Sequence, residues 1–102
     1  MNTVMAFSFV LIWHLSVDQN RLEEFMAVTD AELAASRNFE GNIRFDILSD
    51  SVKPGQIVFI EEWESQAAQQ KYWHWRVENG DVESLQEYLI AEPVLNYYEK
   101  RK

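Results

Sequence analysis

The chain contains no cysteine among its 102 residues. It can therefore form no disulfide, no thiolate nucleophile and no thiolate metal site, which fits a reducing compartment and leads us to expect a cytoplasmic protein. Glycine occurs only at positions 41, 55 and 80, too scattered for a glycine-rich phosphate-binding loop, and histidine occurs only twice. From these scarcities we expect no bound metal, flavin or haem, and no cofactor of any other kind.

Basic residues are also scarce, because nine Lys and Arg stand against seventeen Asp and Glu, giving a net charge of −8. Such a chain repels phosphate backbones, so we expect no nucleic-acid partner. The one long apolar run, residues 4–13, is interrupted only by Ser8 and has no Lys or Arg before it. It is about half the ~20 residues that a membrane helix needs, so we expect no membrane segment.

The pattern of apolar residues predicts alternating strands and helices. Strands are expected at 7–15, 43–47, 56–63 and 94–98, and helices at about 18–38, at about 65–79 and from Asp81 onward. Ser65 is a good N-cap, and Asp18 or Asn20 can cap the first helix. Asp81 can cap a short last helix that carries Tyr88 and Leu89. The order β-α-β-β-α-(α)-β predicts an α+β ferredoxin-like split βαβ sandwich, with a four-stranded antiparallel sheet and helices on one face. We expect residues 1–102 to form one domain.

The first and third predicted strands are apolar on both faces. Phe9 and Leu11 alternate with Val10 and Ile12, and residues 57–60 are apolar without a break. Helices can cover only one face of such a sheet, and a bare apolar face would aggregate. We therefore expect a homodimer in which two sheets pack against each other, forming a dimeric α+β barrel.

Several short motifs resemble the antibiotic biosynthesis monooxygenase (ABM) family. They are Glu-Gly-Asn at 40–42, Glu61-x-Trp63-Glu64-Ser65 followed by Ala-Ala at 67–68, and a late Pro93. The resemblance implies a dimeric α+β barrel with a pocket between each sheet and its helices. Some members oxygenate quinols or polyketide-derived phenols without metal or flavin, others degrade haem, and many have no known activity.

The family's functional residues match this chain only in part. Where members often carry a histidine, nine residues after Trp63, this chain has Tyr72. The polyketide oxidisers have an asparagine and a tyrosine where Phe59 and Gln69 stand, and the haem degraders' histidine aligns with Val82. Trp63 is the only one of these positions at which this chain has the family's residue.

Three aromatic residues, Tyr72, Trp73 and Trp75, fall within four positions of one predicted helix. At 100° per residue they cannot share one face. In one interpretation Tyr72 and Trp75 fill the core while Trp73 lies at a surface or dimer contact. In the other, Trp63, Tyr72 and Trp75 wall a flat pocket for an aromatic ligand, with Tyr72 as hydrogen-bond donor.

The polar candidates have alternative interpretations as well. His14 is either a hydrogen-bonded core residue or a base in the pocket, and Arg44 either pairs with a carboxylate such as Asp46 or Glu61 or steadies a substrate oxyanion. The acidic residues at 61, 62 and 64 resemble a solvated strand end, although one of them, if buried, could accept a proton. His74 and Glu78 have metal-ligand spacing, but two ligands do not make a site.

These observations lead to one functional hypothesis and one alternative. The hypothesis is a cofactor-independent monooxygenase acting on a small electron-rich aromatic of the phenol or quinol type. Its assigned residues are His14 as base, Tyr72 and Arg44 as oxyanion partners, and Trp63 and Trp75 as stacking walls, with no metal ligand. The alternative is a non-catalytic dimeric barrel that binds a small hydrophobic ligand.

Overall fold

The computed structural model describes residues 7–101, which form four strands and three α-helices in the predicted order. The elements are β1 (Phe7–Ser16), the 3₁₀ helix η1 (Gln19–Arg21), α1 (Leu22–Asn38), β2 (Asn42–Ser49), β3 (Gln56–Trp63), α2 (Gln66–Glu78), α3 (Asp81–Gln86) and β4 (Val94–Arg101).

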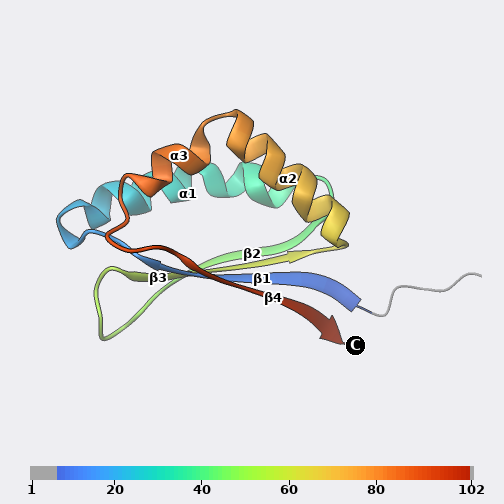
Figure 1. Ribbon diagram of the computed structural model, residues 1–102, viewed down its shortest axis with the longest axis horizontal. Helices are drawn as coiled ribbons and strands as arrows, with labels where there is room; N and C mark the ends of the chain where they lie inside the picture. The colour runs from blue at the N-terminus through green and yellow to red at the C-terminus, as the bar shows by residue number, and fades with distance from the viewer. Residues whose placement is uncertain (1–6, 102) are drawn as a thin grey trace, which may run out of the picture.

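The four strands form one sheet in the order β2-β3-β1-β4, and every neighbouring pair is antiparallel. All three helices lie on one face of this sheet, with α2 and α3 beside α1 (Figure 1). This arrangement confirms the α+β ferredoxin-like fold predicted from the sequence.

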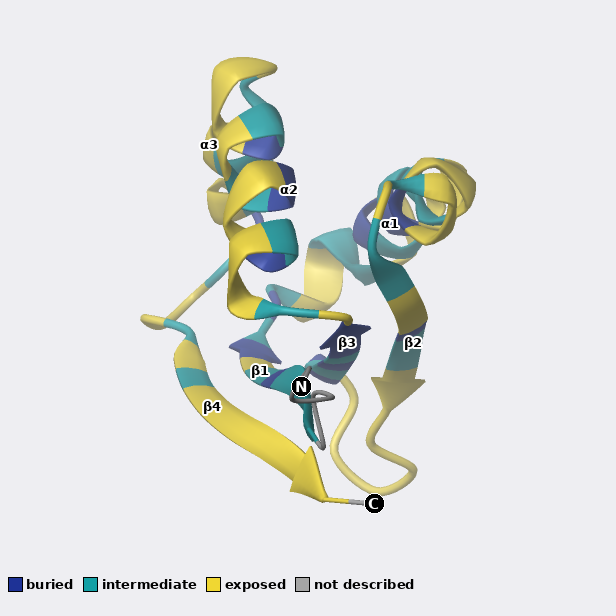
Figure 2. Cartoon of the chain, turned by 90° about the vertical axis from the view of Figure 1, so that its right-hand side faces the viewer, coloured by how far each residue is buried: buried dark blue, intermediate teal, exposed yellow. Residues whose placement is uncertain are grey.

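The core lies between the sheet and the helices. Its fully buried members include Leu11 of β1, Phe25 of α1, and Ile57 and Trp63 of β3. Figure 2 shows the buried positions on the sides of these elements that face one another, whereas β4 is exposed along most of its length. The period-two alternation of β1 and β3 therefore sends one set of residues to the core and leaves the other set on the outer face.

A tight junction joins the turn after α1 to the start of α2. Gly41 has φ +90°, and a Cβ at this position would lie 2.6 Å from Cβ of Ala68. Its carbonyl accepts a hydrogen bond of 2.8 Å from the backbone N–H of Glu64. The Ser65 hydroxyl accepts one of 3.1 Å from the Ala68 N–H and so caps α2. The Glu-Gly-Asn and Glu-Ser motifs thus meet at one point and fix the position of α2 over the sheet.

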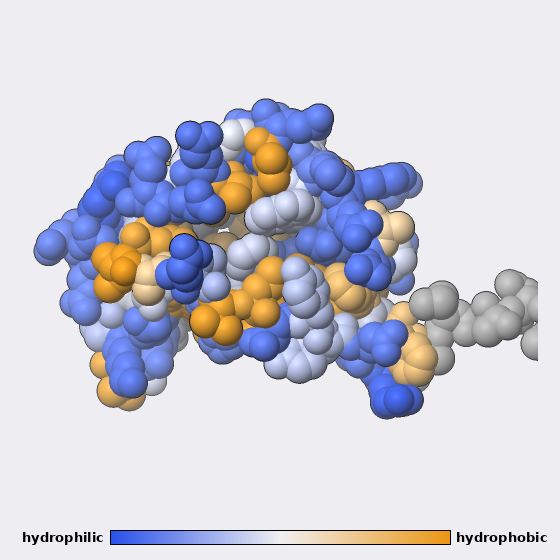
Figure 3. All heavy atoms as spheres, viewed as in Figure 1, coloured by the Kyte–Doolittle hydropathy of each residue, from blue (hydrophilic) through white to orange (hydrophobic). Residues whose placement is uncertain are grey.

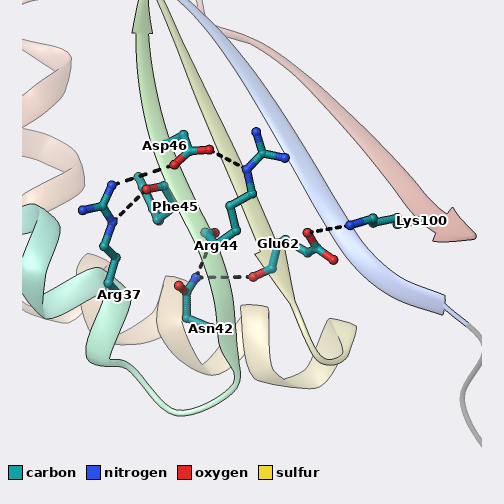
Figure 4. A network of polar contacts seen from close by, with 7 residues as sticks. All are labelled: Arg37, Asn42, Arg44, Phe45, Asp46, Glu62 and Lys100. Carbon is teal, nitrogen blue, oxygen red and sulfur yellow. Dashed lines mark hydrogen bonds and ion pairs between the residues drawn. The ribbon is translucent and has the colours of Figure 1, made fainter. Parts of the chain in front are cut away.

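The outer face of the sheet has an apolar centre flanked by ion pairs. Ile12 and Ile60 lie side by side there, next to Val10 and Val58. Figure 4 shows the charged flanks, where Arg44 pairs with Asp46, and Lys100 lies 3.5 Å from Glu62. No helix of residues 7–101 covers this face (Figure 1).

The chain around α3 differs from the sequence-based expectation. We expected Asp81 to cap a helix that carries Tyr88 and Leu89, but Gly80 is the N-cap and α3 ends at Gln86. Tyr88 lies beyond the helix and packs edge-on against Phe25 at 5.6 Å. Within the described residues, no helix has both the length and the apolar character needed to span a membrane.

Candidate functional site

A cavity of about 350 Å³ lies between the sheet and the helices. Its opening can be seen in Figure 3 between the helical layer and the sheet, where hydrophobic residues gather. The sheet contributes Trp13, Phe59 and Glu61 to the floor, and α2 contributes Tyr72, Trp73 and Arg76 to the roof. Residues of α1 and α3, among them Leu33 and Leu85, complete the walls. This size falls in the range that small-molecule sites occupy, roughly 300–1,000 Å³.

Glu61 is a buried carboxyl group in the floor of this cavity, with a residue exposure of 3%. One of its oxygens accepts a hydrogen bond of 2.7 Å from the indole N–H of Trp13, and the other accepts one of 3.0 Å from Trp63. Burial raises the pKa of Glu61 to about 7, although both indole hydrogen bonds act in the opposite direction by stabilising the charged form. The cavity therefore contains a group that exchanges its proton near neutral pH.

Arg76 holds together the polar part of the roof. Its Nε donates to the Tyr72 hydroxyl at 2.9 Å, and its Nη2 donates to the Ser36 hydroxyl at 2.7 Å and to the Glu32 carbonyl at 3.1 Å. Its Nη1 donates to Asp81 at 2.8 Å. Because these partners come from α1, α2 and α3, the guanidinium joins all three helices. Burial also raises the pKa of the Tyr72 hydroxyl, so this group is a neutral phenol at physiological pH.

The aromatic residues form two rows. Trp13 and Trp73 stack at 5.5 Å with an interplanar angle of 26°, and both line the cavity. Trp63 and Trp75 lie behind Tyr72, at 4.8 and 6.2 Å between ring centroids, and neither lines the cavity. Trp63 is completely buried at the end of β3.

The structure therefore corrects the expected pocket walls. Of the three residues assigned to them, only Tyr72 borders the cavity. Trp73, which we expected at a surface or dimer contact in the core interpretation, borders it instead of Trp75. The reason is the rotation of α2, which turns Tyr72 and Trp73 toward the cavity and turns Trp75 toward Phe39, 5.2 Å away.

His14 and Arg44 lie on the other side of the sheet from Tyr72. Trp13 and Leu15 face the helices, so the alternation of β1 turns His14 outward, where it is exposed. Arg44 pairs with Asp46 on the same outer face (Figure 4). The expectation that these two side chains share a pocket with Tyr72 is therefore corrected. In the described residues, no group of three or more His, Asp or Glu is placed to hold a metal ion, so the pair His74 and Glu78 gains no further ligand.

Sequence reasoning did not single out Glu61 from its acidic neighbours, and it missed Trp13 and Arg76. The strand period could have selected Glu61, because residues 57, 59, 61 and 63 share one face. Two partners of Arg76, Ser36 and Glu32, lie 40 and 44 positions away in the chain, so no local pattern indicates these contacts.

Comparison with known proteins gives a consistent assignment. The model of the antibiotic biosynthesis monooxygenase family matches residues 8–74. No curated protein matches the chain significantly in sequence. Solved structures with the same fold include a conserved protein from Methanosarcina mazei, with 18% identity, a TM-score of 0.86 and coverage of 95% of both chains. A Nitrosomonas europaea protein, provisionally named an antibiotic biosynthesis monooxygenase, has 21% identity and a TM-score of 0.80, with 97% of this chain and 95% of that chain covered.

Proposed function

The chain belongs to the antibiotic biosynthesis monooxygenase family, and on that premise we propose that it oxygenates a small electron-rich aromatic molecule of the phenol or hydroquinone type without a cofactor. The observation that carries this proposal is the cavity between sheet and helices. It combines stacked indoles, a volume of about 350 Å³ and a buried carboxyl group that titrates near neutrality. An aromatic ring with a hydroxyl group fits such surroundings.

The proposed chemistry asks little of the protein. A phenol that loses its proton in a dry cavity becomes electron-rich enough to react with dioxygen itself. For a hydroquinone the balance is one molecule of substrate and one of dioxygen giving one hydroxyquinone and one water. The substrate supplies all the electrons, one oxygen atom enters the ring, and the other leaves as water. The protein needs only to bind the ring, exclude water and accept a proton.

We also propose that the protein is a homodimer. The apolar centre of the outer sheet face, around Ile12 and Ile60, is partly exposed in a single chain, and Tyr98 beside it is half-exposed. A second copy packed sheet to sheet would remove this surface from water.

One observation favours the alternative of a non-catalytic barrel that binds a hydrophobic ligand. All three guanidinium nitrogens of Arg76 are engaged by Glu32, Ser36, Tyr72 and Asp81. The Tyr72 hydroxyl is therefore committed to a structural network, and the roof has few donors to offer a substrate oxyanion.

The experiment that separates the two functions is oxygen uptake with a panel of hydroquinones and electron-rich phenols, measured against autoxidation in buffer. Leu33→Trp places a larger side chain in the cavity wall and should abolish uptake above the buffer rate. Val77→Trp, on the exposed side of α2, makes a similar change outside the cavity and should retain it. A wild-type rate equal to the buffer rate across the panel would leave the binding barrel as the function.

A further inference from the structure

We propose that Glu61 accepts the hydroxyl proton of the bound molecule and that the cavity selects uncharged aromatic ligands over anionic ones. This inference rests on the proposed function in one respect, namely that the ligand is the substrate of the oxygenation. Its two parts, the acceptor and the charge selection, come from the geometry of the cavity.

Glu61 is the carboxyl group in the floor of the cavity, and it has acceptor capacity to spare. A carboxylate offers about four lone-pair directions. The indole N–H groups of Trp13 and Trp63 use one direction on each oxygen. These two contacts also fix the orientation of the carboxyl group, since both indoles are themselves held by packing. A hydroxyl on a ring that lies in the cavity can therefore donate to an oxygen that is already positioned.

The charges around the cavity disfavour an anionic ligand. The helical side opposite Glu61 is lined by Glu32 of α1, Tyr72 and Arg76 of α2, and Asp81 of α3. Arg76 is the only cation in this lining, and Asp81 and Glu32 lie 2.8 and 3.8 Å from it. Three carboxyl groups thus face one guanidinium whose charge is already compensated. A carboxylate or phosphate on the ligand would meet uncompensated negative charge in a poorly solvated space.

The proton affinity of Glu61 suits the role of acceptor. Burial raises the pKa of this carboxyl to about 7, and the guanidinium of Arg76 lowers it only as the smallest of the contributing effects. Below that pH the carboxyl is protonated and accepts a hydroxyl less strongly. Above it, the charged carboxylate accepts the hydroxyl proton, which passes to a Glu61 oxygen while the electron pair stays on the ligand oxygen.

Equilibrium binding of 2-naphthol and 2-naphthoate, which share a ring system and are not oxygenated under anaerobic conditions, tests both parts. Calorimetric titration is carried out from about pH 5.5 to about pH 8.5, where the phenol remains neutral and the carboxylate remains charged. Affinity for 2-naphthol should rise by about tenfold across this range as Glu61 ionises. At the upper pH the affinity for 2-naphthoate should be about tenfold or more below the affinity for 2-naphthol. The affinity for 2-naphthoate should also fall as the pH rises.

Variants assign the pH dependence to one residue. Glu61→Gln should make 2-naphthol binding independent of pH and weaken it about tenfold at the upper pH. Glu62→Gln changes the neighbouring buried carboxyl, which faces the other side of the sheet, and should leave the dependence intact. Should Glu61→Gln fail to fold, Trp13→Phe is the second variant, because it keeps the carboxyl group but removes one indole donor. In Trp13→Phe the midpoint of the pH dependence of 2-naphthol affinity should move to higher pH.

The outcomes distinguish this inference from the proposed function. Equal affinity for the two ligands at the upper pH, an unchanged pH profile in Glu61→Gln, an unmoved midpoint in Trp13→Phe, or no binding of 2-naphthol would overturn it. The expected binding pattern without oxygen uptake would support the inference and refute the oxygenase. Oxygen uptake that is unchanged in Glu61→Gln would support the oxygenase and refute the role of Glu61 as proton acceptor.

Discussion

At the scale of one residue, Glu61 shows how a buried ionisable group can lower the stability of the folded state. Its carboxyl is almost completely buried, and two indole N–H groups compensate only part of its lost hydration. The folded state therefore prefers the protonated form, with a pKa raised from its usual 4.5 to about 7. Between these two values the folded state binds more protons than the unfolded state, so stability falls as pH rises through this window.

Replacing Glu61 with glutamine should remove this pH dependence. At about 1.4 kcal/mol per pKa unit, a shift from 4.5 to about 7 corresponds to roughly 3 kcal/mol. The free energy of unfolding of Glu61→Gln, relative to wild type, should therefore increase by roughly that amount between about pH 4.5 and about pH 8. Urea unfolding across this range measures it. A difference between the two proteins that stays constant with pH, or one that Glu62→Gln reproduces, would show that Glu61 does not carry this cost.

At the same scale, the sequence predicted the aromatic character of the site better than its chemistry. Tyr72 was expected at the cavity and lies there, but His14 was assigned as a base and faces the opposite side of the sheet. A histidine is noticed because its ordinary pKa is near 7, whereas Glu61 acquires such a pKa only through burial. The degree of burial is a property of the packed molecule, so residue type alone could not reveal it.

At the scale of elements, the junction of Gly41 with Ala68 positions the helix that carries Tyr72, Trp73 and Arg76. The turn before β2 approaches α2 so closely that no side chain fits at position 41. This contact explains why a glycine occurs at position 41 and a small residue, alanine, at position 68. It also couples the position of the cavity roof to a turn that contributes nothing to the cavity itself.

Gly41→Ala should destabilise the protein more than Gly80→Ala. Both glycines have positive φ, so both variants bear a backbone strain of about 1–2 kcal/mol. Only at Gly41 does the new methyl group also meet Ala68, whereas nothing lies within 4 Å of a Cβ at Gly80. The additional cost should be about 1 kcal/mol or more, measured by urea unfolding.

A double-mutant cycle identifies the contact responsible. In an Ala68→Gly background, the cost of Gly41→Ala should decrease by about 1 kcal/mol or more, because the opposing methyl group is gone. Equal losses of unfolding free energy for Gly41→Ala and Gly80→Ala, or additive losses in the double-mutant cycle, would mean that the close approach of residues 41 and 68 does not affect stability.

The elements themselves followed from local patterns. The apolar runs of β1 and β3 predicted these two strands, and Ser65 as N-cap predicted the start of α2, each to within a few residues. The segment after α2 was less predictable, since Gly80 rather than Asp81 caps α3, and Tyr88 is held by Phe25 rather than by helix geometry. Packing against α1 determines the conformation of this segment, and the local sequence does not indicate that α1 is its packing partner.

At the scale of the whole molecule, the order of elements was enough to predict the fold, because few arrangements of four strands and two long helices satisfy antiparallel pairing with short connections. The sheet has one covered and one open face (Figure 1). The same apolar residues that predicted two covered faces, Val10 and Ile12 among them, lie on the open one.

The proposed homodimer can be tested on that open face. Wild type should sediment with about twice the chain mass of 12.1 kDa. Ile60→Glu should give monomers or unfolded chains, because an unpaired buried charge costs several kcal/mol or so. Val52→Glu, at a loop position that is 80% exposed, should remain dimeric. A well-behaved wild-type monomer at micromolar concentration, or a folded dimer of Ile60→Glu, would contradict this assembly.

The most direct test of the proposed oxygenase is the fate of isotopically labelled dioxygen during the oxidation of a hydroquinone. Wild type in an atmosphere of ¹⁸O₂ should give a hydroxyquinone carrying one labelled atom, with the second labelled atom in water. Leu33→Trp, which narrows the cavity, should lose this product while Val77→Trp keeps it. An unlabelled quinone formed together with hydrogen peroxide, or equal labelling by all three proteins and by buffer, would show that the cavity does not catalyse monooxygenation.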